Sequence, residues 1–420
     1  MKSSAPLRAA FAAAFLFASA PAVMAQTDTP QDTPDGAAGA GQEKSASEGA
    51  PPASGDTPPA AAEQPAKPDK LMVASWGGAY GESQKRAYFT PFQAETGIAI
   101  EVISHKGGLD ILTARDESLR PKWDLVDLDP ATLERACRGG ALEKLDASAL
   151  AAAGDGTSAS DDFLPGMLHE CGVPSVAWSS AIVFDKRAFK KKAPRTAKDF
   201  FDIKNYPGKR VLPRGPEYTL ELALMADGMA PDEVYDALAG SEGVERAFKK
   251  LDAIKDQIIW WDRAREPLEL LASRKAAMAL AFNGRIFSAI VAESKPFGLI
   301  WDAQVFDLDL WAIPKGSAYK ASALEFIAFA TTPERLAQQA QWFPYGPVRK
   351  SALKLIGKHP EVDVDMAKYI PTSKDNFKRA LRRDAMWWQE NGAELKTRFG
   401  DWAAGEDAPG PDAESEIFTQ

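Results

Sequence analysis

Apolar residues first form a regular pattern immediately after residue 70. Residues 71–75 make a short apolar run, Gly77 and Gly78 interrupt it, and Tyr88 and Phe92 lie one helical turn apart in the next segment. A second apolar run then ends near residue 103. This order predicts a strand, a glycine turn, a helix and a second strand.

The alternation of apolar strands with amphipathic helices continues along the chain. Further strands are expected at residues 123–128, 171–184, 210–213, 257–261, 276–282 and 310–313. Helices are expected at 132–138, at 219–227, along the stripe Val244, Phe248, Leu251 and Ile254, from Pro267, at 321–330 and 333–342, and through the remainder to Trp402. Strands alternating with helices indicate an α/β fold class in which each parallel-rich sheet is flanked by helices.

Two extended segments, at 171–184 and 310–313, predict that the chain passes twice between two lobes joined by a hinge. We expect a first lobe at 71–176, a second lobe at 177–310 and a return to the first lobe at 311–370. C-terminal helices at 371–405 and a frayed tail at 406–420 would follow. Ligand sites in such sheets lie beyond the carboxyl ends of the strands, so the predicted site lies in the cleft between the lobes.

The start of the chain has the pattern of an exported protein. Basic residues and an apolar stretch precede the small residues Val23 and Ala25, which predicts a signal peptide at 1–25. Residues 26–70 are rich in Pro, Ala, Gly and acids and almost lack large apolar side chains, so they predict a disordered linker. No cysteine follows the expected cleavage point to carry a lipid, and we expect a soluble periplasmic protein.

Charge and missing motifs narrow the function. A net charge of −9 without a basic patch argues against nucleic acid as a partner and favours a neutral or cationic ligand. The chain contains three histidines, His105, His169 and His359, and no HExxH, GxSxG or Walker motif. We therefore predict a protein that is not an enzyme, with no cofactor and no metal cluster.

The two cysteines, Cys137 and Cys171, would be exported to an oxidising compartment. Thiols in that compartment are usually paired, so one disulfide is predicted. The alternative is a pair of inert buried thiols.

Aromatic and acidic residues recur at the ends of the predicted strands. They are Trp76, Asp127, Asp129, Trp178, Trp260, Trp261, Asp262, Asp309 and Trp311. Aromatic faces attract ammonium groups and carboxylates add charge-assisted hydrogen bonds, so this lining suits an organic cation. The alternative is that many of the 11 tryptophans only pack in the core.

An ordered series of segments across residues 71–402 resembles the periplasmic solute-binding proteins of ABC importers, in particular the spermidine/putrescine-binding class. The segments are SWGGAYGESQKRAYFTPFQAETGIAIEV, WDLVDLDPATLERACRGGALEKLD, GVPSVAWSSAIVFDKRAF, FFDIKNYPGKRVLP, LLASRKAAMALAFNGR, LDLWAIPKGSAYKASALEFIAFATTPE, YGPVRKSAL and WWQENG. The resemblance implies a type II two-lobe fold that closes on its ligand by a hinge motion. It also implies a monomer that delivers its ligand to a membrane permease with a cytoplasmic ATPase.

The resemblance places Trp76 on the first strand-to-helix loop as a ligand wall, and Asp309 as the acid that holds an amino group. Three departures stand beside this match. Phe282 replaces a tryptophan that is frequent in polyamine binders, Asp307 replaces another aromatic residue, and the tyrosine expected near Asp129 is missing. The predicted ligand-binding set is Trp76, Gly77, Tyr80, Asp127, Asp129, Trp178, Ser179, Arg214, Glu217, Trp261, Asp262, Asn283, Asp309 and Trp311.

The direction of the Arg214 side chain decides between two classes of ligand. Polyamine binders present acids at this place, and an arginine facing the cleft would repel a diamine and suit a carboxylate, so the ligand would be an amino acid derivative with both charges. If Arg214 instead pairs with Glu217 or faces solvent, the polyamine interpretation holds.

Two other functions are compatible with parts of the pattern. A secreted enzyme could use Asp127, Asp129 or Asp262 as acid and base. An iron receptor on the same fold would need clustered tyrosines, and the eight tyrosines of the chain are not grouped in sequence.

Overall fold

The computed structural model describes residues 67–114 and 121–404. The predicted signal peptide, nearly all of the predicted linker and the predicted tail at 406–420 lie outside these residues. Within the described part of the chain, no helix combines the length and the apolar character that a membrane span requires.

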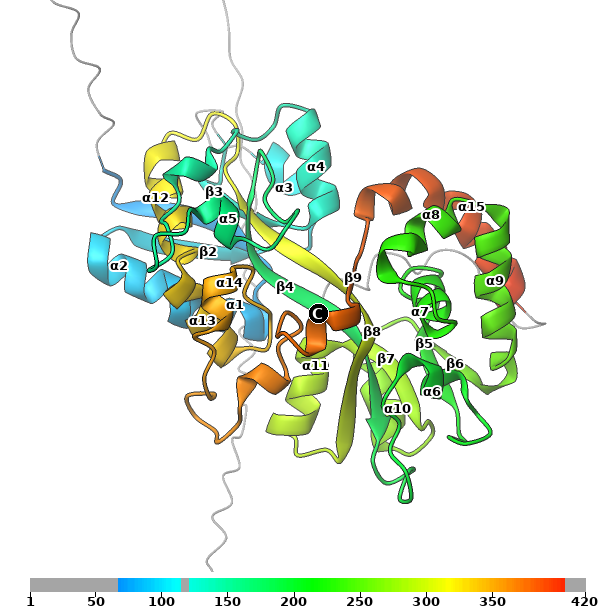
Figure 1. Ribbon diagram of the computed structural model, residues 1–420. Coiled ribbons are helices and arrows are strands. Elements are labelled where there is room, and N and C mark those ends of the chain that lie inside the picture. Colours follow the sequence, from blue (N-terminus) through cyan, green and yellow to red (C-terminus); the bar gives the residue numbers. More distant parts are fainter. Residues whose placement is uncertain (1–66, 115–120, 405–420) are drawn as a thin grey trace, which may run out of the picture. The chain divides into compact units, whose positions relative to one another are not determined.

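The described residues form nine strands, which join into one hydrogen-bonded sheet in the order β2-β1-β3-β8-β4-β7-β5-β6, with β9 paired to β8. The strands are β1 Lys70–Ser75, β2 Ala99–Ser104, β3 Leu125–Leu128, β4 Val173–Asp185, β5 Arg210–Pro213, β6 Ile258–Trp261, β7 Met278–Phe282, β8 Phe297–Ala312 and β9 Leu381–Arg382. Parallel pairs form at both ends of this sheet, and β4 and β8 run antiparallel between them (Figure 1). The predicted α/β class is confirmed.

The α-helices alternate with these strands. They are α1 Gly78–Gln84, α2 Thr90–Thr96, α3 Asp110–Thr113, α4 Pro130–Arg138, α5 Ala159–Asp162, α6 Ala197–Phe201, α7 Thr219–Ala226, α8 Val234–Leu238, α9 Ser241–Asp252, α10 Glu266–Ala272, α11 Asn283–Phe287, α12 Lys320–Ala330, α13 Pro333–Trp342, α14 Lys350–Leu353 and α15 Ala385–Ala403. The longer α-helices lie where the hydrophobic pattern predicts them, and short helices such as α3, α5, α6, α8 and α11 were not predicted. Two π-helical turns, Lys85–Phe89 and Ser288–Ala292, continue α1 into α2 and extend α11.

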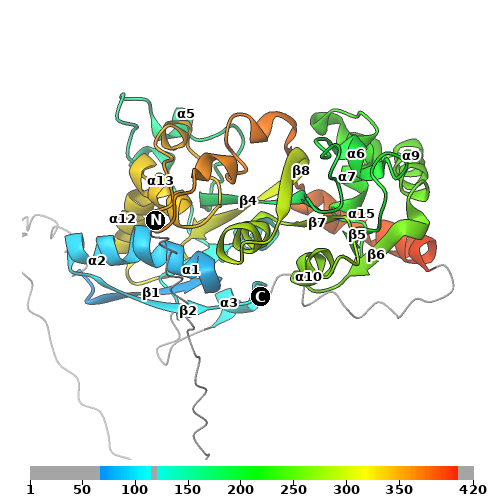
Figure 2. The ribbon, with the colours of Figure 1, turned by 90° about the horizontal axis from the view of Figure 1, so that it is seen from below.

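The opening unit folds as predicted. Strand β1 pairs in parallel with β2 (Figure 2). Tyr88 and Phe92, on the helical segment between the two strands, are completely buried. Gly77 turns the chain from β1 into α1 with φ 74° and ψ −156°, a conformation that essentially only glycine adopts. A Cβ atom at this position would also collide with the Ser104 hydroxyl. Both observations explain why this position requires a glycine.

Apolar side chains gather into two main groups. The first core contains side chains of β1, β3, α2, α12 and α13, and Phe92 and Phe326 pack at its centre. The second core contains side chains of α7, α9 and the C-terminal helix α15, including Phe248 and Phe399. A third group, with Leu271 and Ile286 of α10 and α11, also packs against β4 and β7. Strands β4 and β8 contribute residues to both main cores and connect them.

Strand β8 differs most from its prediction. Only residues 310–313 were expected to be extended, but the strand begins at Phe297 and has 16 residues. Asp302, Gln304, Asp307 and Asp309 interrupt its apolar pattern, because these polar side chains make specific contacts inside the protein. A strand that carries buried polar groups is not visible to hydrophobic periodicity.

The prediction of helix through the remainder of the chain is wrong for residues 343–349 and for the longer segment 354–384. This segment consists mostly of turns and bridges, with the 3-10 helices Met366–Lys368 and Asn376–Arg379 and the short strand β9. Pro360 and Pro371 lack the backbone N–H that a continuous helix requires. Only α15, with Trp387 and Trp388, fulfils the expectation of a C-terminal helix.

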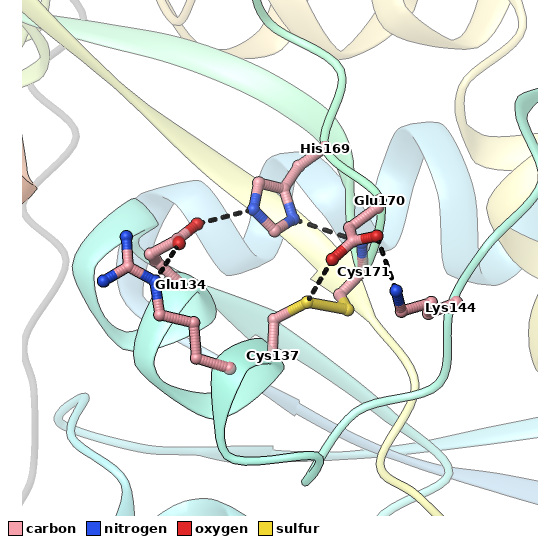
Figure 3. The surroundings of a disulfide bond; sticks show 7 residues. Glu134, Cys137, Lys144, His169, Glu170 and Cys171 are labelled. Carbon is pink, nitrogen blue, oxygen red and sulfur yellow. Dashed lines mark hydrogen bonds and ion pairs between the residues drawn. A yellow bond between two sulfur atoms is a disulfide. The ribbon is translucent and has the colours of Figure 1, made fainter.

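The predicted disulfide is confirmed: Cys137 on α4 is bonded to Cys171, with their Cα atoms 5.9 Å apart (Figure 3). The bond closes a sequence separation of 34 residues, for which a chain-entropy argument gives about 4 kcal/mol of stabilisation. His169, next to the bond, forms an ion pair of 2.7 Å with Glu134 of α4 when protonated. The disulfide therefore fastens α4 to the segment that leads into β4.

Candidate functional site

Asp309 of β8 is a buried carboxylate without a cationic partner. Its residue is 5% exposed, and no Lys, Arg or His in the described part of the chain lies within ion-pair distance of it. Burial raises the pKa of Asp309 well above its usual value, and Asp127, Asp307 and Asp129 raise it further, while a hydrogen bond from Trp178 lowers it. A buried acid among other acids is stabilised by an added cation.

Asp127, at the carboxyl end of β3, is a second buried acid of this centre. Its Oδ2 atom accepts hydrogen bonds from the Ser75 hydroxyl (3.0 Å), the Tyr80 hydroxyl (3.1 Å) and the Gln84 amide (2.8 Å). Its Oδ1 atom is buried and has no hydrogen-bond partner. Burial raises the pKa of Asp127 to about 7 although these three donors oppose the shift. Asp127 and Asp309, both in the predicted ligand-binding set, thus lie close enough for the charge of Asp127 to raise the pKa of Asp309.

Aromatic rings adjoin the acids. Trp178 of β4, whose side chain is half-buried, lies 5.5 Å from Phe282 in an edge-to-face arrangement. Phe282 also contacts Tyr218 and Trp261, each at 5.9 Å between ring centroids. Trp178, next to Asp309, and Phe282, which packs against Trp178, thus present partly exposed aromatic surface, whereas Trp261 is only 2% exposed. Such surface attracts an ammonium group through the ring faces.

Arg285 is a site residue that the sequence analysis missed. It lies on α11, directly after β7, and is half-buried, and its guanidinium has no ion pair or hydrogen bond to any other described residue. Burial lowers the pKa of Arg285, Tyr345 raises it and Arg265 lowers it. A partly buried guanidinium without a partner is stabilised by an anion, and its planar fork suits a carboxylate.

Tyr345 connects the acidic centre to Arg285. Its ring lies 5.2 Å from the ring of Tyr80, whose hydroxyl is 3.3 Å from the Ser175 hydroxyl, which in turn donates to the Asp309 carbonyl. Burial raises the pKa of the Tyr345 hydroxyl, Asp309 raises it further, and Arg285 lowers it. The Tyr345 hydroxyl thus experiences a negative and a positive charge, neither of which has an ion-pair partner among the residues that the structure describes.

The sequence analysis also did not select Arg383, which forms a cluster of charged residues next to these residues. It contacts Glu217 through Nε (3.0 Å) and Nη2 (2.6 Å), and Asp307 through Nη1 (3.2 Å). Glu217 is therefore held by Arg383, and the sequence alternative of an Arg214–Glu217 pair is wrong.

Arg214 instead forms an ion pair with Asp262. Its Nε atom lies 2.9 and 3.2 Å from the two carboxylate oxygens, and the two side chains are 35% and 39% exposed. Both residues were predicted to bind a ligand. Because each neutralises the other, neither presents a free charge.

Four other predicted site residues have internal partners. Asp129 caps the amino end of α4 by accepting the Thr132 N–H. Asn283 accepts the Ser179 N–H at 2.9 Å and donates to the Pro344 carbonyl at 2.6 Å. These contacts connect β4, α11 and the segment that carries Tyr345. Trp311 is completely buried in the first core between Phe89 and Phe326, so we assign it to the core.

Trp76 and Gly77 lie on the first strand-to-helix turn, as expected. The Trp76 ring lies 4.5 Å from His105, and a Cβ atom on Gly107 would approach the indole to 3.1 Å. The His105 Nε2 atom is 2.9 Å from the Asp127 carbonyl, and burial lowers the pKa of His105. The loop from His105 to Gly107 therefore covers one face of Trp76, which is half-buried.

Two further features lie apart from this centre. Among the described residues, Cys137, His169 and Cys171 are close enough to share a metal ion, but the two sulfur atoms are bonded to each other. A pocket of about 520 Å³ opens near the amino ends of β1 and β2, lined by Lys70, Lys122 and Tyr319 among others. It contains none of the acids described above, which lie beyond the opposite ends of the strands.

The raised carboxyl pKa values predict a characteristic pH dependence of stability. Burial raises the pKa of Asp127 to about 7, of Asp307 to about 6 and of Glu221 to about 7, against about 4 in an unfolded chain. The folded state then binds more protons than the unfolded state between pH 4 and 7, so folding stability falls as the pH rises through this range. We expect the melting temperature of the ligand-free protein to fall by roughly 5 °C or more between pH 5 and pH 8. Thermal unfolding followed by circular dichroism measures this slope.

The variant Asp127→Asn is the control for this pH effect, because its amide does not titrate. The slope of melting temperature against pH should become shallower in this variant. An unchanged slope would show that Asp127 is not a source of the effect.

These features identify the class of protein. Residues 87–369 match the family of bacterial extracellular solute-binding proteins, and the chain belongs to this family. Its α/β fold with two crossing strands and its buried acids beside half-buried aromatic rings are consistent with that membership.

Individual relatives are known for particular solutes. The gamma-aminobutyric acid (GABA)-binding protein of Pseudomonas aeruginosa is 37% identical over 344 residues, which cover 82% of this chain and 94% of the relative. The solved structure of the Atu4243 GABA receptor is 29% identical, with a TM-score of 0.64, and covers 81% of this chain and 100% of its own. AgtB of A. tumefaciens R10, solved in complex with agropinic acid, is 28% identical, with a TM-score of 0.58, and covers 80% of this chain and 98% of its own.

Proposed function

We propose that this protein is a periplasmic receptor for a small solute that carries an ammonium group at one end and a carboxylate at the other, with GABA as the representative ligand. The observation that carries this proposal is a pair of charges, Asp309 and Arg285, that both act on Tyr345 and have no ion-pair partner among the described residues. A zwitterion of suitable length would neutralise both.

The ammonium end is assigned to Asp309. Its carboxylate is buried, has a raised pKa and has no cation among its described neighbours. An ammonium group would form a charge-assisted hydrogen bond with it and would contact the partly exposed faces of Trp178 and Phe282. Asp127 would add to the negative potential at a distance while remaining bonded to Ser75, Tyr80 and Gln84.

The carboxylate end is assigned to Arg285 rather than to Arg214. Arg214 already forms an ion pair with Asp262, so a ligand would have to replace an existing carboxylate to bind it. Arg285 has no such partner in the described chain and is held near Tyr345, because its neighbour Gly284 packs directly against the Phe343 and Tyr345 rings. The sequence analysis offered a ligand that carries both charges and binds Arg214. The proposal keeps this kind of ligand but assigns its carboxylate to Arg285.

The relatives support this choice of ligand class. One curated relative is a GABA-binding protein, one solved relative is a GABA receptor, and another was solved with agropinic acid. A polyamine is the second candidate, because Asp307 and Asp309 are two acids on the same face of β8, although Asp307 already accepts a hydrogen bond from Arg383. Delivery to an ABC permease and its ATPase follows from the solute-binding family, and no chemical conversion of the solute is expected.

A panel of ligands tests this proposal. Purified protein is mixed with GABA, 5-aminopentanoate, butylamine, putrescine and spermidine, and the melting temperature is recorded for each. Because a ligand that binds only the folded state stabilises it by mass action, GABA or its homologue should give the largest increase. If only putrescine or spermidine shifts the transition, the polyamine assignment replaces the proposal. If no member of the panel does, both assignments fail.

A further inference from the structure

Strand β8 presents two buried acids on the same side. Asp307 and Asp309 are two residues apart, so their side chains leave the same face of the strand at a spacing of about 7 Å. Both are buried, at 1% and 5% exposure, and the charge of Asp307 raises the pKa of Asp309. Two carboxylates at this spacing match the two ammonium groups of a short diamine such as putrescine.

Arg383 occupies the second of these positions. Its Nη1 atom lies 3.2 Å from the Asp307 carboxylate, and its Nε and Nη2 atoms bind Glu217. The side chain is 12% exposed, and its guanidinium lies 6.0 Å from the Tyr218 ring, which itself contacts Phe282. This arginine therefore belongs to the same group of residues as the aromatic rings next to Asp309.

The backbone holds Arg383 in this place. Strand β9 pairs with Val305 and Phe306 of β8, and the Arg383 N–H donates to the Phe306 carbonyl at 2.8 Å. Arg383 donates a hydrogen bond to Asp307 and not to Asp309. Asp309 is therefore the carboxylate of β8 that has no cationic partner among the described residues. The chain thus supplies one of the two cations that this pair of acids would take from a diamine.

We propose that Arg383 is a specificity-determining residue: it occupies, as an internal cation, the position that the second ammonium group of a diamine would take, and so restricts the site to solutes with a single amino group. This inference rests on the proposed function, because it assumes that the ligand ammonium binds Asp309. A diamine would have to place its second charge beside a guanidinium, and like charges in a buried site repel strongly. A solute with one ammonium group meets no such repulsion.

The test compares putrescine and GABA binding by isothermal titration calorimetry in the wild type and in Arg383→Gln. The variant releases Asp307 and Glu217, so putrescine should bind at least about tenfold more tightly than to the wild type. The conservative variant Arg383→Lys keeps the internal cation and should keep the discrimination against putrescine. The inference would be overturned if putrescine affinity increased in both variants or in neither of them.

Two controls separate the local cation from net charge and from folding. Arg246→Gln removes the same charge from α9, where Arg246 pairs with Asp227, and should leave the putrescine affinity within about threefold of the wild type. The double variant Arg383→Gln/Asp307→Asn removes the released acid and should lose the gain. An equal gain in Arg246→Gln, or a gain that persists in the double variant, counts against the inference. If Arg383→Gln does not fold, Arg383→Gln/Glu217→Gln replaces it, because Asp307 is still released.

The two proposals can fail separately. If wild-type protein binds GABA but Arg383→Gln gains no putrescine affinity, the role of Arg383 is wrong and the proposed function stands. If the wild type binds putrescine tightly and GABA not at all, the proposed function fails, and the role of Arg383 fails with it.

Discussion

Replacing Asp309 by asparagine should weaken GABA binding by at least about 100-fold, equivalent to about 2.7 kcal/mol. The substitution keeps the shape of the side chain but removes the charge that an ammonium group requires, and charge-assisted hydrogen bonds are roughly twice as strong as neutral ones. The same variant should melt at a higher temperature than the wild type without ligand, because it removes a buried carboxylate that Asp127, Asp307 and Asp129 destabilise. Calorimetric titration and thermal unfolding measure the two effects.

The matched control for this variant is Asp363→Asn. The Asp363 side chain is 85% exposed and pairs only with Lys358 at the surface, so the same chemical change there should alter neither affinity nor melting temperature appreciably. An Asp309→Asn protein that binds GABA as tightly as the wild type would remove Asp309 from the site.

Replacing Arg285 by glutamine should abolish the preference for a ligand with a carboxylate. We expect wild-type protein to bind GABA at least about 100-fold more tightly than butylamine, which has the same ammonium group and no carboxylate. In Arg285→Gln the two ligands should bind with affinities within about threefold of each other, because the anion partner is lost and the Asp309 contact remains. The ratio of the two dissociation constants, measured by titration, is the readout.

Arg265→Gln is the control for a general field effect. Arg265 also affects the pKa of Arg285, but it is 52% exposed and lies next to Glu269, so its removal should change the ratio by less than about threefold. If Arg265→Gln abolishes the preference as strongly as Arg285→Gln, a diffuse positive potential rather than a direct contact recognises the carboxylate.

Local patterns predicted most of the fold because its strands and helices are bounded by strong signals. The apolar run before Gly77, the buried strand before Asp129 and the short run at residues 210–213 all became strands in the structure. The exceptions have a common cause. Residues of β8 and of the segment 354–384 are held by contacts with distant parts of the chain, such as the bonds from Gln304 to the carbonyls of Pro371 and Asn376. Hydrophobic periodicity does not register such contacts.

The candidate site was predictable from sequence only where residue type and position on a strand were sufficient evidence. Asp127, Trp178 and Asp309 lie at strand ends or on crossing strands, and their residue types alone indicated a cation site. Arg285 and Arg383 could not be chosen from the 50 lysines and arginines of the chain. Partial burial without an ion-pair partner among the described residues distinguishes Arg285, and bonds to acids from remote segments distinguish Arg383. The pairing of Arg214 with Asp262, 48 residues apart, was equally hidden.

The central claim is that Asp309 holds the ammonium group and Arg285 the carboxylate of one bound zwitterion. The most direct measurement is a crystal structure of the protein grown with GABA. The ligand nitrogen should lie within hydrogen-bond distance of the Asp309 carboxylate, and the ligand carboxylate should be bonded to the Arg285 guanidinium. GABA bound through Arg214, or with its ammonium group remote from Asp309, would contradict the claim.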